Sequence, residues 1–253
     1  EPYDADVLER LQGLKCLSRC GVGLDNVDLT AAAQRGITVT NTPEAVIRPV
    51  AELALAMSLD LLRRLSRHTR VVKSGEWQKF SGRLLLGKTV AVVGLGRIGR
   101  AVAELMQAVG ASVVGVDPRA EEEWARSRSV RVMSLGDALA CADIVSLHLA
   151  NDPEHAFRMT APHFSAMKPR SILINLARGN FIDEEALMEA LKSGHLAGAG
   201  LDVYSQEPYD GPLAELEDVV LTPHVATLTE ESRLVMEAEA TANVLGVLRR
   251  MGG

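Results

Sequence analysis

Three polar residues that could do acid–base and anion-binding chemistry each follow an apolar stretch in the second half of the chain: Arg178, Glu207 and His224. A histidine gives and takes a proton near neutral pH because its unperturbed pKa is close to 6.5. An arginine stays charged and binds a carboxylate through two parallel hydrogen bonds. A glutamate beside the histidine would favour the imidazolium and hold its tautomer. Taken singly, each residue has an ordinary structural explanation, so the prediction rests on their joint placement.

A glycine-rich turn supplies the second chemical signal. Residues 94–99 fit the pattern G-x-G-x-x-G, and Asp117 stands 23 residues after Gly94. In such a turn Gly94 permits the tight bend, Gly96 lets a pyrophosphate approach the backbone, and Gly99 allows close packing of helix on strand. The N-terminus of the following helix favours phosphate groups, and an acidic residue accepts hydrogen bonds from a ribose. We therefore expect a dinucleotide site.

Asp117 also bears on which dinucleotide binds. At about 5 Å, its charge would repel the 2′-phosphate of NADP by roughly 1.5–6 kcal/mol, depending on the effective dielectric constant. Arg119 lies close enough in sequence to soften this repulsion. The sequence therefore predicts NAD in preference to NADP.

The elements that must position these residues follow from the apolar pattern. Helical spacing predicts a long helix over residues 50–73 and further helices over 97–109 and 184–192. The strands are predicted by short apolar runs, at residues 14–20, 37–41, 89–93, 112–116, 130–133, 144–149, 171–176, 197–203 and 219–221. Strands that alternate with helices indicate a parallel sheet with right-handed crossovers. The expected fold class is α/β, a Rossmann-type doubly wound parallel sheet.

Ligands of open α/β sheets bind outside the carboxyl ends of the strands. Arg178, Asp202, Glu207 and His224 all follow predicted strands, so they should converge on that edge. His148 is a rival base, but it ends a continuous apolar run. We interpret it as a core residue or a wall of the cofactor site.

Composition and charge narrow the classes of protein that the chain could belong to. The 253 residues are 47% hydrophobic and carry a formal net charge of −6. That composition is typical of a globular chain, and the acidic balance gives no general attraction to nucleic acid or anionic membranes.

The basic stretch 63–73 is interpreted as a solvated helix face or a contact between subunits. The three cysteines are too few for a disulfide framework and are expected as buried, reduced thiols in the cytoplasm. No metal site is expected.

Beyond these patterns, the chain resembles the D-isomer-specific 2-hydroxyacid dehydrogenase family, and most of all its 3-phosphoglycerate dehydrogenase branch. The matching stretches run in family order over nearly the whole chain: residues 21–28 (GVGLDNVD), 41–43 (NTP), 51–54 (AELA), 94–99 (GLGRIG), 175–179 (NLARG), 183–184 (DE), 198–203 (GAGLDV) and 222–224 (TPH). Two positions depart from the usual glycine, Asn180 and Ala226.

The resemblance implies roles for individual residues. The catalytic trio would be Arg178, Glu207 and His224, and the backbone of Val22 and Gly23 would hold the substrate carboxylate together with Arg178 and His224. Asp202 would bind the nicotinamide carboxamide. The expected cofactor contacts are Gly94, Gly96, Arg97, Ile98, Gly99, Asp117, Ala177, Asp202, His224 and Ala226.

The resemblance also implies two domains. Residues 44–223 would form the NAD-binding domain, and residues 1–43 with 224–253 a discontinuous, flavodoxin-like substrate domain. The family carries several dozen residues before the point that matches Glu1, so we expect upstream sequence that completes this domain. The helix over 50–73 would link the domains and help to form a homodimer.

The expected activity is NAD-dependent hydride transfer on a small D-2-hydroxyacid or 2-ketoacid, as in 3-phosphoglycerate dehydrogenase. Reduction of glyoxylate or hydroxypyruvate is an alternative within the class. Two further alternatives are an NAD-sensing corepressor that binds partner peptides and an inactive NAD-binding remnant. Neither nucleic acid nor membrane is expected as a partner.

Overall fold

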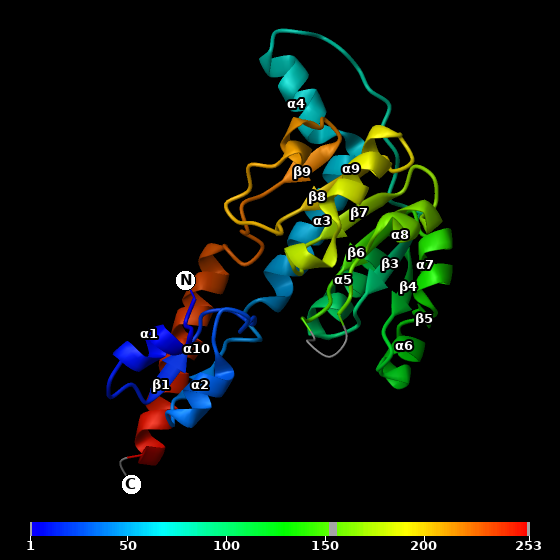
Figure 1. The fold of residues 1–253 in the computed structure, drawn as a ribbon. Coiled ribbons are helices and arrows are strands. Elements are labelled where there is room, and N and C mark those ends of the chain that lie inside the picture. Colours follow the sequence, from blue (N-terminus) through cyan, green and yellow to red (C-terminus); the bar gives the residue numbers. More distant parts are fainter. Residues whose placement is uncertain (1, 152–155, 252–253) are drawn as a thin grey trace. The chain divides into compact units, whose positions relative to one another are not determined.

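The structure is a computed structural model that describes residues 2–151 and 156–251 (Figure 1). The chain divides into two compact units. The larger unit is Val50–Ala226, and the smaller unit is Glu1–Pro49 together with Thr227–Gly253. These bounds lie within six residues of the divisions expected at 43/44 and 223/224. Each unit has a hydrophobic core of its own.

The larger unit is built on a seven-stranded sheet. All of its strands run parallel, in the order β5-β4-β3-β6-β7-β8-β9. Strand order reverses between β3 and β6, which is the doubly wound arrangement that the sequence predicted. The strands are β3 (Thr89–Val93), β4 (Ser112–Val116), β5 (Arg131–Val132), β6 (Ile144–Leu147), β7 (Ile172–Asn175), β8 (Gly198–Leu201) and β9 (Val219–Leu221).

Helices cover both faces of this sheet, so its central strands are apolar on both sides. In β3, Val90 and Val92 pack in one core, and Ala91 and Val93 pack in the other. The helices and 3-10 turns of the unit are α3 (Ile47–Arg63, which begins in the smaller unit), α4 (Leu65–Lys73), α5 (Arg97–Ala108), α6 (Glu122–Ser127), α7 (Leu135–Cys141), α8 (Ala161–Ala166), η1 (Gly179–Phe181), α9 (Glu184–Lys192) and η2 (Pro212–Glu215).

The smaller unit contains one pair of parallel strands, β1 (Cys16–Ser18) and β2 (Thr38–Thr40). Its helices are α1 (Ala5–Arg10), α2 (Leu29–Gln34) and α10 (Glu230–Met251). A small core of Leu8, Ala31, Ala32 and Ile37 joins α1 and α2, and Leu17 of β1 and Val39 of β2 pack against it. No helix in the described ranges of either unit is both long enough and apolar enough to cross a bilayer.

The prediction of a single helix over residues 50–73 is wrong. The chain breaks at Arg64, whose φ of 55° and ψ of 39° are left-handed, and this break separates α3 from α4. Asp60 explains the break, because its carboxylate accepts a 2.7 Å hydrogen bond from the backbone N–H of Ser66 and so caps the start of α4. The apolar spacing of Leu61, Leu62 and Leu65 continues across the break and concealed it.

Two smaller expectations also need correction. Several predicted strands are shorter in the structure, most clearly the first, where 14–20 becomes Cys16–Ser18. None of the three cysteines is buried: Cys16 and Cys141 are intermediate and Cys20 is exposed. Cys16 lies in β1, Cys20 in the bend that follows it and Cys141 at the end of α7, and neighbouring side chains cover the Cys16 and Cys141 thiols only in part.

Candidate active site

The glycine-rich turn leaves β3 at the point where the strand order reverses. Gly94 has a φ of +96°, and a Cβ at this position would lie 2.6 Å from the carbonyl oxygen of His148. A Cβ on Gly99 would lie 1.8 Å from the carbonyl oxygen of Gly94, so only glycine fits at both positions. A Cβ on Gly96 would meet nothing within 4 Å. The turn is therefore tight on its protein side and open at Gly96.

The helix after the turn fits a phosphate group. Gly96 is the N-cap of α5 and has no side chain to cap the first turn, which contains Arg97 and Ile98. The backbone N–H groups of this turn, together with the helix dipole, suit an anion.

Asp117 stands beside this turn at the end of β4. Its two carboxylate oxygens accept hydrogen bonds from the backbone N–H groups of Leu95 and Arg119, each at 2.8 Å. Each carboxylate oxygen can accept a second bond, so the group can still take ribose hydroxyls. The residues present therefore fit a dinucleotide.

His148 follows β6 and lies behind the glycine turn. Its Nε2 is 2.7 Å from the hydroxyl oxygen of Ser146. Desolvation by burial lowers the pKa of His148 to about 3, so the imidazole is neutral at pH 7. A neutral, partly covered imidazole suits the wall of a site better than a proton carrier.

The structure brings Glu207 and His224 together from the loops that follow β8 and β9. The Nδ1 atom of His224 lies 2.8 Å from one carboxylate oxygen of Glu207. The other carboxylate oxygen accepts a 3.2 Å hydrogen bond from the backbone N–H of Tyr204. Contacts at both carboxylate oxygens therefore fix the orientation of the Glu207 side chain. The contact at Nδ1 leaves Nε2 as the ring nitrogen that can exchange a proton with a substrate.

A buried carboxylate holds the chain around His224. Asp202 is fully buried, and one of its oxygens accepts from the Thr222 hydroxyl at 2.5 Å and the Val225 N–H at 2.8 Å. The other oxygen accepts from the Ala226 N–H at 2.8 Å. These bonds fasten the loop on both sides of His224. Asp202 was predicted to contact the nicotinamide, whereas its hydrogen bonds to the His224 loop were not predicted.

Tyr204 joins the same network. Its hydroxyl lies 2.9 Å from the Thr222 carbonyl oxygen and 3.1 Å from that of Leu201. Burial, followed by the charge of Asp202, raises the pKa of Tyr204 to about 12, so the phenol keeps its proton. Its ring stacks on Tyr209, with centroids 4.4 Å apart. Tyr204 was not among the predicted site residues, and its only signal in the sequence is its place two residues after Asp202.

Arg178 follows β7, the strand next to β8. Its Nη1 donates a 2.7 Å hydrogen bond to the Ala177 carbonyl oxygen. A Cβ on Gly179 would lie only 1.9 Å from the Tyr204 carbonyl group, so the Arg178 loop rests directly on the Tyr204 backbone. Arg178 thus leaves the same edge of the sheet as the Glu207–His224 pair.

Asn175 braces the Arg178 loop from below. It is fully buried; its side chain donates to the Arg178 carbonyl oxygen at 2.8 Å and accepts from the Ala177 N–H at 3.1 Å. A polar residue at the end of an apolar strand must find hydrogen-bond partners when it is buried. Asn175 was not predicted as a site residue, although its place at the end of an apolar run is a signal for this role.

The expected substrate contacts Val22 and Gly23 belong to the smaller unit. Their loop follows β1, where the Gly21 N–H donates to the Thr42 hydroxyl at 2.7 Å and the Val22 carbonyl oxygen accepts from the Asn41 side chain at 2.8 Å. Over the described part of the chain, no group of three or more His, Cys, Asp or Glu residues is arranged to hold a metal ion.

Comparison with known proteins gives the family. Residues 55–226 match the family described as "D-isomer specific 2-hydroxyacid dehydrogenase, NAD binding domain". Over 233 residues the chain is 44% identical to the D-3-phosphoglycerate dehydrogenase of Mycobacterium leprae, which covers 91% of this chain and 44% of that protein. It is 36% identical over 257 residues to the glyoxylate reductase of Korarchaeum cryptofilum, covering 98% of this chain and 77% of that protein.

The chain also resembles solved structures. A protein from Thermus thermophilus superposes with a TM-score of 0.91 at 39% identity, covering 98% of this chain and 80% of that one. The D-lactate dehydrogenase of Aquifex aeolicus, solved with NAD and lactic acid, gives a TM-score of 0.85 at 31% identity, covering 98% and 81%. The chain spans less than half the length of the phosphoglycerate dehydrogenases that it matches. It belongs to the D-isomer specific 2-hydroxyacid dehydrogenase family, and residues 55–226 match the NAD-binding domain of that family.

Proposed function

We propose that this protein transfers hydride between NAD and a small D-2-hydroxyacid or 2-ketoacid, and that 3-phosphoglycerate is the substrate it fits best. The observation that carries the proposal is the 2.8 Å contact between Glu207 and His224. This pair stands at the same edge of the sheet as the glycine-rich turn and Arg178. The bound NAD would supply or accept the hydride.

The residues of the chain do the rest of the chemistry. In the reducing direction, Nε2 of His224 gives its proton to the carbonyl oxygen of the substrate, and in the oxidising direction it removes the hydroxyl proton. Glu207 at Nδ1 stabilises the imidazolium and fixes its orientation. Arg178 binds the substrate carboxylate and polarises the neighbouring oxygen. Val22 and Gly23 are proposed as substrate contacts of the smaller unit.

The cofactor assignment to NAD over NADP rests on Asp117. Its carboxylate is fixed by two backbone N–H groups, so it cannot easily turn away from a 2′-phosphate. At roughly 5 Å, two like charges repel by about 3 kcal/mol at an effective dielectric constant of 20. That is about a hundredfold in affinity.

A phosphate-bearing substrate is favoured by Arg19. Its Nε donates to the side-chain oxygen of Asn26 at 3.1 Å, and its Nη1 would lie 2.6 Å from a Cβ on Gly21. The guanidinium group therefore lies against the loop that would hold the substrate carboxylate. Glyoxylate and hydroxypyruvate carry no phosphate and would not use this cation. Their reduction remains the alternative, since one relative is a glyoxylate reductase.

Three further assignments belong to the same proposal. Residues 44–223 bind NAD, while residues 1–43 and 224–253 bind substrate. The protein is a homodimer, supported by the exposed apolar side chains that follow α3. It acts in the cytoplasm, which the three free cysteines support.

A substrate panel tests the proposal. The purified protein would be mixed with NADH and with 3-phosphohydroxypyruvate, hydroxypyruvate, glyoxylate or pyruvate, and the nicotinamide absorbance followed. We expect the highest kcat/KM for the phosphorylated ketoacid, and an Arg19→Gln variant that loses this preference while it still turns over glyoxylate. Equal rates with phosphorylated and unphosphorylated ketoacids would rule out the phosphate assignment. No turnover of any ketoacid, with NADH still bound, would favour a corepressor-like or inactive protein.

A further inference from the structure

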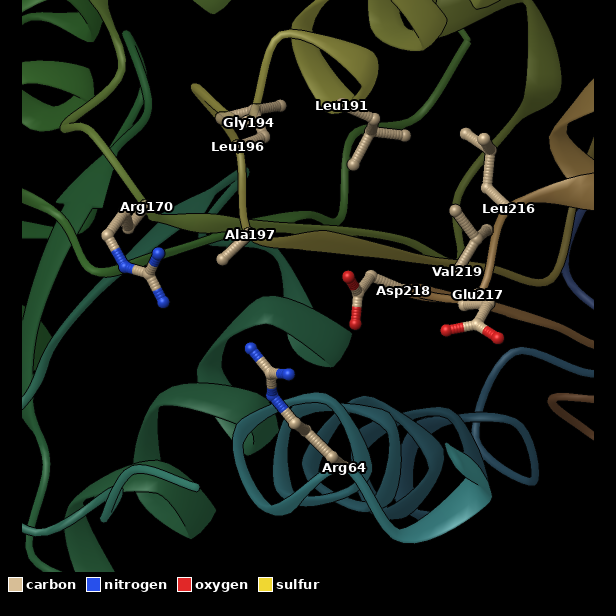
Figure 2. Close-up of a pocket in the computed structure, with 10 residues that line it drawn as sticks. All are labelled: Arg64, Arg170, Leu191, Gly194, Leu196, Ala197, Leu216, Glu217, Asp218 and Val219. Carbon is tan, nitrogen blue, oxygen red and sulfur yellow. The ribbon is translucent and has the colours of Figure 1, made fainter. Parts of the chain in front are cut away.

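A second concavity lies at the opposite edge of the sheet from the candidate active site (Figure 2). It is a pocket of about 180 Å³ beside the residues that precede β7, β8 and β9, and Arg170, Ala197 and Asp218 line it there. Arg178, Asp202 and Thr222 follow the carboxyl ends of these same strands. Four strand residues span roughly 13 Å, so the pocket is separate from the Glu207–His224 pair.

Two arginines reach into this pocket. Figure 2 shows the side chains of Arg64 and Arg170 extending from opposite walls toward the space between them. Within the described part of the chain, neither guanidinium has a carboxylate within 4.0 Å. The neighbouring Arg67 differs, because it pairs with Glu217 at 3.0 Å and with Asp218 at 3.8 Å.

Both arginines have a strained backbone conformation. Arg64 has a φ of 55° and Arg170 a φ of 64°, in the left-handed region that residues other than glycine rarely adopt. Only Ser129 and His224 share this feature among the described residues other than glycine. Strained residues of this kind concentrate at functional sites and ligand clamps.

A third arginine, Arg83, adds positive charge next to Arg170. Arg83 donates from Nη1 to the Arg170 carbonyl oxygen at 2.7 Å. Burial lowers the pKa of Arg83, and the charges of Arg170 and Arg64 lower it further. Asp143 acts in the other direction but pairs with Lys168 at 2.8 Å. Arg83 therefore lies beside Arg170, and its positive charge adds to those of Arg64 and Arg170.

The ion pairs at the pocket leave two guanidinium groups for an anion. Two arginines, Arg64 and Arg170, and two carboxylates, Glu217 and Asp218, line it. Both carboxylates pair with Arg67, and Glu217 also with Arg70, which lie outside the lining. Leu191, Leu196 and Leu216 form an apolar wall, which suits a ligand with a short carbon skeleton.

We infer that this pocket binds a small organic oxyanion, a carboxylate or a phosphate ester, between Arg64 and Arg170. The site lies outside the proposed catalytic machinery and gives a function to Arg64, a residue of the basic stretch 63–73 that the proposed reaction does not use. The shared chemistry is an oxyanion that accepts two charge-assisted, forked hydrogen bonds.

Titration calorimetry tests the inference with two probes, inorganic phosphate and malonate, at constant ionic strength. Saturating NADH is present so that the N-terminus of α5 does not compete for the anion. We expect Arg64→Gln and Arg170→Gln to weaken binding of the better probe at least tenfold, since each removes a charge-assisted hydrogen bond. The probe that binds more tightly identifies the phosphate or the carboxylate class.

Two control variants fix the site. Arg126→Gln removes an exposed arginine that pairs with Glu122 at 3.6 Å, and Arg178→Gln removes the arginine of the active site. Both should bind the probe as the wild type does. The inference is wrong if the wild type binds neither probe, if Arg178→Gln abolishes binding, or if both pocket variants bind normally. Thermal melting in chloride shows whether a variant folds; Arg170, which is exposed, remains informative if Arg64→Gln does not.

Discussion

At the scale of single residues, the site depends on a histidine held in an unfavourable conformation. His224 has a φ of 54°, which costs an ordinary residue about 1 kcal/mol or more. The loop keeps this conformation because the buried carboxylate of Asp202 accepts three hydrogen bonds from residues on either side of it. The chain thus uses one buried charge, fully hydrogen-bonded, to aim the imidazole at Glu207.

The first prediction concerns this pair. His224→Ala removes the proposed proton carrier, and Glu207→Gln removes the charge that stabilises the imidazolium. We expect kcat to fall by about 10²–10⁴-fold in His224→Ala and by a smaller factor in Glu207→Gln, while NADH binds as before. Steady-state kinetics and NADH fluorescence measure the two effects. Glu215→Gln, an exposed glutamate of η2, is the matched control and should keep full activity.

The second prediction concerns pH and His148. Its native pKa is about 3, whereas the unfolded chain protonates a histidine near pH 6.5. Below pH 6.5 the unfolded state therefore binds more protons, and stability is lost as the pH falls from 6.5 toward 3. The loss is at most about 1.4 kcal/mol per pH unit.

Urea unfolding of the wild type and of His148→Gln at pH 7.0, 6.0 and 5.0 measures this loss. The glutamine does not titrate and can still bond Ser146, so its stability should fall less steeply. Parallel curves for the two proteins would show that His148 is not buried in its neutral form.

At the scale of elements, one short segment positions all three proposed catalytic residues. The segment is Tyr204–Ser205, just after β8. Its backbone N–H orients Glu207, the Tyr204 hydroxyl contacts the Thr222 carbonyl in the His224 loop, and Gly179 brings the Arg178 loop onto its carbonyl group. Adjacent parallel strands therefore deliver the three loops to one edge, and this segment sets their spacing.

The third prediction tests that packing. Gly179→Ala places a Cβ 1.9 Å from the Tyr204 carbonyl, so the Arg178 loop must shift. We expect at least a hundredfold loss of kcat/KM for a ketoacid with little change in NADH affinity, because a displacement of about 1 Å in a positioning contact has that effect. Gly136→Ala is the control. It lies in α7, where a Cβ meets nothing, and should be fully active and slightly more stable. Normal kinetics in Gly179→Ala would contradict the packing argument.

At the scale of the whole molecule, the sequence predicted what local patterns determine. Strands β3, β4 and β9 and helix α9 have the predicted bounds, because continuous apolar runs and caps such as Asp183 specify them locally. The break at Arg64, the clamp at Asp202 and the brace at Asn175 were not predicted. Each depends on a hydrogen-bond partner whose position only the folded chain determines, and apolar spacing carries no information about it.

The last prediction concerns assembly. Figure 1 shows α4 standing out from the sheet, and α4 contains no buried residue. Five large apolar side chains between residues 65 and 86 are exposed: Leu65, Val72, Trp77, Leu84 and Leu86. Trp77 is the extreme case, with 83% of its surface exposed. An apolar set of this kind marks a surface that another protein covers, and we propose that a second copy covers it.

Sedimentation equilibrium tests this assembly. The wild type should sediment at about twice the mass of one chain, and a Val72→Ser/Trp77→Ser variant should be shifted toward the monomer. Leu228→Ser/Leu234→Ser is the matched control, because these leucines are also well exposed but belong to other segments. A dimer that survives the first pair and dissociates with the second would place the contact elsewhere.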